Sequence, residues 1–213
     1  MLIQTFVFND LYENTYVVVD ESTKICCILD PGCYSKKEQN ELLRYIEQNH
    51  LHVKAIINTH CHVDHVIGND FCKRTFKAPL FVHENALETL RQVPLYAPLY
   101  GFVHYYETYP DEFLKEGELF SVGNLTFQVL DVPGHCEGHL ALFHEKTPVV
   151  FSGDVLFRNS IGRTDFPGGN FEKIQHSIRR KLYALPDNTI VYAGHGETTT
   201  IGFEKIHNPY IRA

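Results

Sequence analysis

The sequence predicts an α+β protein, an αββα sandwich in which two stacked mixed β-sheets carry helices on their outer faces. Runs of β-branched and aromatic residues gather in two groups, one before residue 60 and one after residue 124. Helical periodicity follows each group, so strands and helices come in blocks along the chain. The 213 residues are 44% hydrophobic and 21% charged, and we expect residues 1–213 to form a single domain.

The first half of the chain is expected to hold five strands and two helices. Asp30-Pro31-Gly32 forms a turn after the third strand, and Ser35 then caps a helix, with Glu38 at the capping-box position. A second helix begins at Asp64 and continues through Phe76 to the fifth strand. The expected strands are Gln4–Phe8, Asn14–Val19, Ile25–Leu29, Val53–Ile57 and Leu80–His83.

The second half is expected to hold four strands and two helices after a stretch without clear periodicity. That stretch, Tyr96–Tyr109, is rich in tyrosine among prolines and a glycine. Because aromatic rings with polar ends make adaptable contacts, this stretch is a candidate lid or wall of a substrate site, with Tyr105 as a candidate substrate contact. A buried helix or an oligomer contact fits it equally well. The expected strands are Leu125–Asp131, His139–Phe143, Val149–Ser152 and Thr189–Ala193, and the helices are Phe171–Leu185 and Thr200–His207.

A histidine-rich heptapeptide follows the fourth expected strand. Thr59-His60-Cys61-His62-Val63-Asp64-His65 places four imidazole or carboxylate side chains within six residues, directly after a buried apolar run. Imidazole and carboxylate are the ligands that divalent metals such as zinc prefer. We interpret the heptapeptide as one half of a metal site rather than as a polar loop that happens to be rich in histidine.

Three later apolar runs end in a similar way. Gly134-His135, Gly153-Asp154 and Gly194-His195 each place a glycine before a possible ligand at the end of an expected strand. Glycine permits the sharp turn that lets the next side chain point along the strand axis. One Gly-His pair alone is weak evidence, but four strand ends with histidine or aspartate predict a ring of ligands at one edge of the sandwich.

The number of candidate ligands indicates two metal ions. One catalytic ion usually takes about three side chains and a water, whereas two ions roughly 3.5–4 Å apart that share a carboxylate use the whole set. Asp154 is the expected bridge, and Asp64 and Asp154 are the expected catalytic residues. The donors are nitrogen and oxygen only, which suits zinc, iron or manganese without choosing among them. We expect two divalent ions, with zinc as the first choice and iron or manganese as alternatives. The seven candidates are His60, His62, Asp64, His65, His135, Asp154 and His195.

These motifs, in this order, resemble the signature of the metallo-β-lactamase superfamily. The stretches Phe151–Gly169 and Thr199–Pro209 narrow the resemblance to short hydrolases similar to glyoxalase II, which hydrolyse hydroxyacylglutathione thioesters. The chain differs from the family at His139, where a serine is often found, and it lacks the helical C-terminal extension of classical glyoxalase II. The resemblance implies that His60, His62 and His135 hold one metal, that Asp64, His65 and His195 hold the other, and that Asp154 is shared.

The expected reaction is hydrolysis of a thioester of a 2-hydroxy acid. A metal pair lowers the pKa of a bridging water from 15.7 toward about 7 and polarises the substrate carbonyl. A thiolate, whose parent thiol has a pKa of about 8.5, leaves without a strong acid. Arg163 is a candidate for binding a substrate carboxylate or for pairing with Asp165 or Asp187. His139 is a candidate contact of the substrate or of a ligand, or a structural histidine.

Three other functions fit the same residues. A mononuclear iron persulfide dioxygenase shares this fold and a similar Gly162–Asp165 stretch, and would use His60, His62 and either Asp154 or His135. A lactone or β-lactam hydrolase would use the same metals. A metal-stabilised interaction module is the least favoured, because closed structural zinc sites have four ligands and usually cysteines.

Charge and composition limit the partners. A net charge of −7 and a pI near 6.0 provide no basic field for phosphates, so no nucleic-acid partner is expected. No apolar run is long enough to cross a bilayer, and the start has no signal-peptide pattern. The six cysteines lack framework spacing, which favours reduced thiols and a cytoplasmic location. The expected partner is a small-molecule thioester, and the sequence leaves the oligomeric state open.

Overall fold

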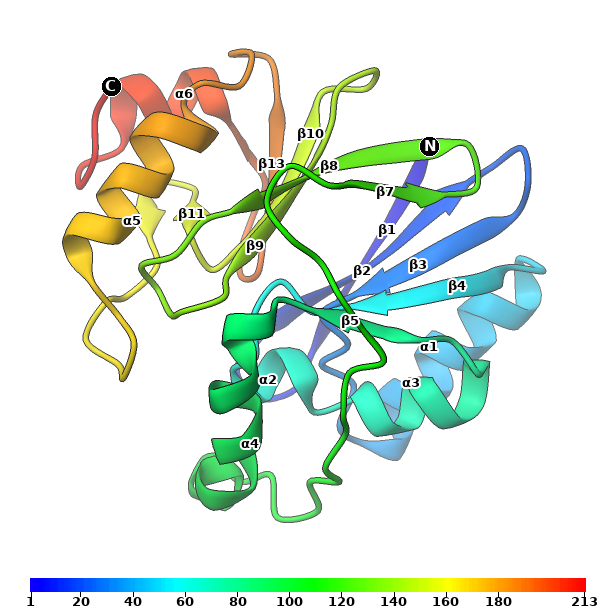
Figure 1. Ribbon diagram of the computed structural model, residues 1–213. Helices are drawn as coiled ribbons and strands as arrows, with labels where there is room; N and C mark the ends of the chain where they lie inside the picture. Colours follow the sequence, from blue (N-terminus) through cyan, green and yellow to red (C-terminus); the bar gives the residue numbers. More distant parts are fainter. The chain divides into compact units, whose positions relative to one another are not determined.

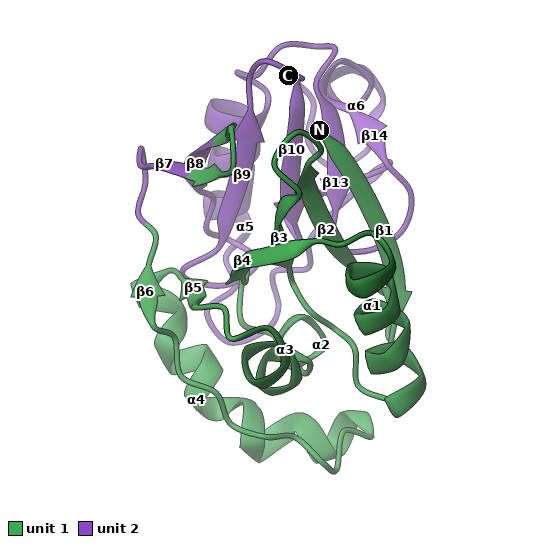
Figure 2. Ribbon diagram, turned by 90° about the vertical axis from the view of Figure 1, so that its right-hand side faces the viewer, with its two compact units in different colours: residues 1–114, 121–126 green, residues 115–120, 127–213 purple.

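A computed structural model describes all of residues 1–213, and the chain divides into two compact units (Figure 2). Unit 1 comprises residues 1–114 and 121–126, and unit 2 comprises residues 115–120 and 127–213. Two six-stranded mixed sheets with helices (Figure 1) confirm the α+β class. The expectation of a single domain stays a prediction.

The sheet of unit 1 changes from antiparallel to parallel along its width. Its first three strands are antiparallel, whereas β3 to β6 are parallel. Parallel strands bring their carboxyl ends to one edge, and there the Asp30 N–H donates to Ile57 O across 2.9 Å. The strand order is β1 (Leu2–Phe8), β2 (Glu13–Asp20), β3 (Ile25–Leu29), β4 (His52–Ile57), β5 (Leu80–Val82) and β6 (Glu112–Phe113).

Four helices of unit 1 pack their buried residues into one hydrophobic cluster with one face of this sheet (Figure 1). The predicted capping box is present at the first helix: the Glu38 N–H donates to Ser35 Oγ, and the Ser35 N–H donates to Glu38 Oε2. The helices are α1 (Lys36–Gln48), α2 (Val63–Val66), α3 (Asn69–Phe76) and α4 (Leu87–Tyr96), with short 3-10 turns at Glu84–Ala86 and Ala97–Tyr100.

Two helical expectations for unit 1 need correction. The helix expected from Asp64 is divided into α2 and α3 at Gly68, whose N–H donates to Pro31 O across 2.8 Å. A Cβ at Gly68 would lie 2.7 Å from Cys33 Sγ, so this close approach requires glycine. Helix α4 was not predicted, because its fully buried face is limited to two residues and Pro94 lies within it.

The second sheet has one parallel strand pair, β10 with β13, among antiparallel neighbours. The strand order is β14 (Thr199–Thr200), β13 (Ile190–Ala193), β10 (Val149–Gly153), β9 (Leu140–His144), β8 (Leu125–Asp131) and β7 (Leu119–Val122), and the β7–β8 turn is grouped with unit 1. A two-stranded hairpin, β11 (Leu156–Phe157) and β12 (Ser160–Ile161), follows β10.

The helices of unit 2 pack on one face of its sheet. Helix α5 (Phe171–Ser177) continues as a π-helical turn over Ile178–Leu182, and α6 (Ile201–His207) is the last helix. Ile174, Ile178 and Leu182 are fully buried, as the sequence predicted, in a cluster that includes strand residues such as Val150. In the whole structure, no helix combines the length and the apolar character that a bilayer span needs.

Candidate metal centre

The histidine-rich loop of unit 1 follows β4 and leads directly into α2. His60 and His65 are fully buried, Asp64 is 8% exposed and His62 is half-buried. The ring centroids of His60 and His65 lie 4.1 Å apart, and those of His60 and His62 lie 4.8 Å apart. Asp64 Oδ2 lies 3.6 Å from His65 Nε2. The structure therefore brings the four predicted ligands of unit 1 together.

Three asparagines hold the backbone of this loop. Asn9 Nδ2 donates to the Asp64 carbonyl across 3.2 Å, and Asn58 Nδ2 donates to the His65 carbonyl across 3.0 Å. Asn69 Nδ2 donates in turn to Asn58 Oδ1 across 2.9 Å, in a fully buried pair of amides. These bonds satisfy polar groups that would be costly to bury unpaired, and they fix the positions from which the ligand side chains start.

Contacts with Thr59 and Asp30 indicate which ring nitrogen of His60 and of His65 is available to a metal. Thr59 Oγ1 donates to Asp30 Oδ2 across 2.6 Å, so its only proton is used there. His60 Nδ1, which lies 3.1 Å from Thr59 Oγ1, must therefore be the donor, and its Nε2 keeps a lone pair for a metal. His65 Nδ1 lies 3.3 Å from Asp30 Oδ2, an arrangement that likewise turns Nε2 toward Asp64.

The sequence analysis did not identify Asp30 as a residue of the site. Its carboxylate and the ring nitrogens of His60 and His65 lie within 4.8 Å of one another. Both carboxylate oxygens accept hydrogen bonds from Thr59, so we interpret Asp30 as a residue that orients the histidines. The available signal was a carboxylate directly after an apolar strand, the same pattern that had identified Asp154.

Glu13, in β2, is a second buried carboxyl that the sequence analysis missed. Thr15 Oγ1 lies 2.8 Å from Glu13 Oε2 and 2.8 Å from the Asp30 carbonyl, and it accepts from the Gly32 N–H at 2.9 Å. One hydroxyl proton cannot serve both oxygens, whereas a protonated Glu13 satisfies all three contacts. Burial raises the pKa of Glu13 well above its ordinary value, and the nearby Asp30 carboxylate raises it further.

In unit 2, three predicted ligands lie together around Asp154. Oδ2 of Asp154 lies 3.6 Å from His135 Nε2 and 3.6 Å from His195 Nε2. His135 Nδ1 donates to the Arg163 carbonyl across 2.8 Å, which leaves Nε2 as the ligand atom. His135 and Asp154 are buried, whereas the side chain of His195 is 28% exposed.

The predicted turn at Gly134 is confirmed, and it positions His135. Gly134 has a φ of 135°, a conformation that side-chain-bearing residues rarely adopt. A Cβ there would lie 2.1 Å from the Ile174 nitrogen in α5. Because no side chain fits between the loop and the helix, the glycine allows the loop to pack directly on α5.

The spacing of ligand atoms within each unit fits bound metal ions. The three Nε2–Oδ2 distances, from His65 to Asp64 and from His135 and His195 to Asp154, are all 3.6 Å. This is too long for a hydrogen bond, but two ligands at about 2.0–2.1 Å from a tetrahedral ion lie about 3.3–3.5 Å apart. The nitrogen and oxygen donors suit zinc, iron and manganese alike.

The structure also places the three candidate substrate residues. Arg163 donates two 2.7 Å hydrogen bonds to Asp165, and its Cζ lies 3.7 Å from the Phe166 ring centroid. Arg163 therefore pairs with Asp165, which was one of the two roles expected for it, the other being to bind a substrate carboxylate. The hydrogen bonds from Arg163 lower the pKa of the Asp165 carboxyl to about 2. His139 is fully buried.

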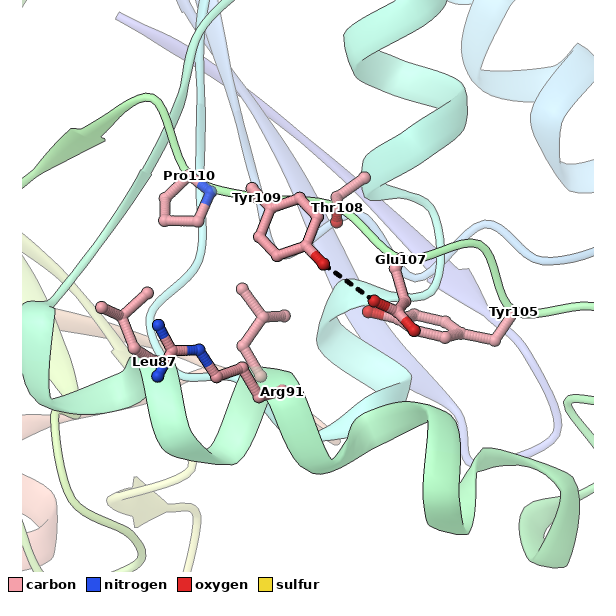
Figure 3. A pocket seen from close by; sticks show the side chains of 8 residues that line it. Leu87, Arg91, Tyr105, Glu107, Thr108, Tyr109 and Pro110 are labelled. Carbon is pink, nitrogen blue, oxygen red and sulfur yellow. Dashed lines mark hydrogen bonds between the residues drawn. The ribbon is translucent and has the colours of Figure 1, made fainter.

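Tyr105 lines a small cavity in unit 1 (Figure 3). The cavity has a volume of about 70 Å³ and is also lined by Thr108, Arg91 and Glu107, the last of which accepts a 3.0 Å hydrogen bond from Tyr109. Burial raises the pKa of Tyr105, and its closeness to the Cys61 thiol raises it further.

The chain belongs to the metallo-beta-lactamase superfamily, whose family model matches residues 9–195. It is 36% identical over 203 residues to hydroxyacylglutathione hydrolase GloC of Haemophilus influenzae, an alignment that covers 94% of this chain and 93% of that protein. The superfamily and the clusters of histidine and aspartate that could hold a metal ion together place the chain in the class of metal-binding hydrolases.

Solved structures share the fold. The B3 metallo-beta-lactamase BLEG-1 has a TM-score of 0.89 at 33% identity, covering 100% of both chains. TTHA1623 in a di-iron-bound form has a TM-score of 0.86 at 33% identity, covering 98% of this chain and 100% of that one. ETHE1 from Myxococcus xanthus has a TM-score of 0.81 at 27% identity, covering 98% of this chain and 84% of that one.

Proposed function

We propose that the protein hydrolyses a thioester of a 2-hydroxy acid, in the manner of glyoxalase II, with the help of two divalent metal ions. The observation that carries the proposal is the all-nitrogen and oxygen donor set, in which the buried His65 and His135 each have Nδ1 beside a protein oxygen and Nε2 beside an aspartate. Similarity to GloC over nearly the whole of both chains supports the thioester class.

We assign all seven predicted ligands to the metal pair. His60, His62 and His135 would hold one ion, Asp64, His65 and His195 the other, and Asp154 would be shared. Zinc is the first choice. The similar TTHA1623 structure contains two irons, so iron is the principal alternative, followed by manganese.

The ions, when bound, would supply an acidified water and positive charge at the substrate carbonyl. The protein itself orients the participants. Asp64, held through its carbonyl by Asn9, would align the attacking water, and Asp154 would keep its two histidines at a fixed separation. A thiolate leaves without a proton donor because its parent thiol is acidic, with a pKa of about 8.5. This requirement favours thioesters over amides.

Two residues are proposed substrate contacts. The Arg163 side chain is 54% exposed. A substrate carboxylate that displaced Asp165 would accept the same two hydrogen bonds from the guanidinium. Tyr105 belongs to the proposed lid, Tyr96–Tyr109, of which residues 101–109 form no helix or strand. The small-molecule thioester remains the only proposed partner. We also propose a cytoplasmic location, because all six cysteines are free thiols and buried.

Metal analysis combined with a substrate panel tests the proposal. The purified protein should contain two ions per chain and should release a thiol from 2-hydroxyacyl thioesters, hydroxyacylglutathione among them. Asp154→Ala should lose metal and turnover together. An unchanged metal content and rate in Asp154→Ala would contradict the shared-ligand role. Absence of thiol release from every thioester tested would contradict the thioester function itself.

Similarity to ETHE1 supports a second candidate, a mononuclear iron persulfide dioxygenase. That enzyme would bind one iron through His60, His62 and either His135 or Asp154, and it would consume oxygen on a persulfide. One iron per chain with oxygen uptake would therefore replace the thioesterase proposal. Similarity to BLEG-1 justifies including β-lactams and lactones in the same panel.

A further inference from the structure

The main chain at Asp154 is fixed where β10 leaves the sheet. The β10–β13 pairing shifts its register between Phe151 and Gly153, and Gly153 has a φ of 49°. On the carbonyl side, a Cβ at Gly162 would lie 1.8 Å from the Asp154 oxygen. Only glycine at position 162 therefore lets the following loop approach the Asp154 carbonyl so closely.

The Asp154 N–H lies beyond the last ladder pair, and a side chain supplies its partner. His139 Nε2 accepts a hydrogen bond from the Asp154 nitrogen across 3.1 Å. His139 Nδ1 lies 3.1 Å from the Leu140 carbonyl. A backbone N–H can only donate and a carbonyl can only accept, so His139 is neutral with its proton on Nδ1. Its side chain is fully buried.

We propose that His139 is a positioning residue: its Nε2 fixes the main chain of Asp154 and thereby holds the Asp154 carboxylate between His135 and His195. The proposal rests on the proposed metal function, and it replaces the idea that His139 contacts substrate. A fully buried ring engaged at both nitrogens by the backbone has no nitrogen left to offer a substrate.

The position of His139 in the fold suits this role. His139 directly precedes β9, and its carbonyl accepts from the Val132 N–H across 2.7 Å, so the residue is anchored to β8 and β9. The ring then spans from this anchor to the end of β10. The ring also packs edge-on against His135, with the two ring centroids 6.1 Å apart. Because one backbone donor at Asp154 depends on this ring, a change of the ring moves Asp154 through its main chain.

The test compares three variants by cobalt binding. His139→Leu removes the acceptor, whereas His139→Gln keeps an acceptor oxygen at a similar reach. His144→Leu is the matched control, because His144 is also a buried histidine of the β9 segment but accepts from Thr147 in a turn instead. Cobalt affinity should fall by about 10–100-fold in His139→Leu, the range typical for loss of a residue that orients a metal ligand. In His139→Gln and His144→Leu the cobalt affinity should stay within about threefold of wild type.

A second readout does not need metal. In the metal-free protein, hydrogen exchange of the Asp154 amide should be faster in His139→Leu than in wild type or His144→Leu. Unchanged cobalt affinity in His139→Leu would overturn the inference, as would an equal loss in His139→Gln. Cobalt binding without thioester hydrolysis would overturn the proposed function and leave the inference standing, whereas a wild-type protein that binds no cobalt would overturn both.

Discussion

His65 Nδ1 lies 3.3 Å from Asp30 Oδ2, and both side chains are almost completely buried. Asp30 also accepts two 2.6 Å hydrogen bonds from Thr59, the residue that precedes His60. One carboxylate thus orients two histidines of unit 1. A partner of this kind gives a metal-binding histidine a fixed orientation and a higher basicity.

We predict that Asp30→Ala lowers metal affinity by about 10–100-fold. The reason is that His65 loses its partner and Thr59 loses the acceptor that directs its proton. Competition with a chelator of known affinity measures the effect. Asp187→Asn is the control, because that carboxylate is exposed and pairs with Lys205. Wild-type affinity in Asp30→Ala would show that the histidines orient themselves without it.

Glu13 makes a pH-dependent contribution to stability. Burial raises its folded pKa well above 4.5, so the unfolded chain releases this proton at a lower pH than the folded protein does. The stability contribution is therefore present below the unfolded pKa and is lost as pH rises toward the folded pKa. Glu13→Gln should remove this loss. The free energy of unfolding in urea should therefore rise in Glu13→Gln relative to wild type as the pH goes from 5 to 8. Glu145→Gln, at an exposed position, should show no such trend; a parallel pH profile for Glu13→Gln and wild type would contradict the neutral carboxyl.

The contact of Gly134 with α5 should make it intolerant of a methyl group. Gly134→Ala places a Cβ about 2 Å from backbone in α5 and also strains a positive φ. We expect a large fall in melting temperature, with reduced metal content as His135 shifts. Gly101→Ala separates the two causes, because Gly101 has a φ of 87° but a methyl group added there would meet nothing within 4 Å. Equal effects of the two variants would assign the cost to backbone strain alone.

Glu204 is predicted to stabilise unit 2 without affecting metal binding. This fully buried carboxylate accepts from Thr199 Oγ1 at 2.6 Å, from Asn208 Nδ2 at 2.9 Å and from the Asn159 N–H at 3.1 Å. Glu204→Gln replaces one acceptor oxygen by a donor, so at least one of these buried donors loses its partner, at a cost of about 1–3 kcal/mol. Urea unfolding measures the loss. Glu197→Gln, in an exposed pair with Arg158, should cost much less.

Metal removal should destabilise the protein as well as inactivate it. A ligand that binds only the folded state raises stability with its free concentration, so a chelator should lower the melting temperature and added zinc should restore it. Asp154→Ala should respond weakly to both treatments. A wild-type melting temperature that is unaffected by chelator and by zinc would contradict a metal site in the folded protein.

Local chemistry explains what could be predicted from the sequence. The histidine-rich heptapeptide, the glycines before His135, Asp154 and His195, and the capping box at Ser35 each depend on neighbours within a few residues. The hydrophobic patterns similarly predicted most strands and the α+β class, because a strand or helix carries its period in its own residues. The break at Gly68 was missed because it depends on close packing against Pro31 and Cys33. Helix α4 was missed because it buries only two residues and contains Pro94.

The sequence by itself determined the class of fold and the kinds of side chain offered to a metal. Only the tertiary structure decided which groups support them: Asp30 reaches Thr59 across 29 residues, and His139 reaches Asp154 across 15. Such pairs leave no local pattern, because a hydrogen bond between strand ends depends on sheet register rather than on sequence spacing. The protonation of Glu13 likewise depends on the Asp30 carbonyl and the Gly32 N–H, which both bond to Thr15, and the tautomer of His139 depends on the Asp154 N–H.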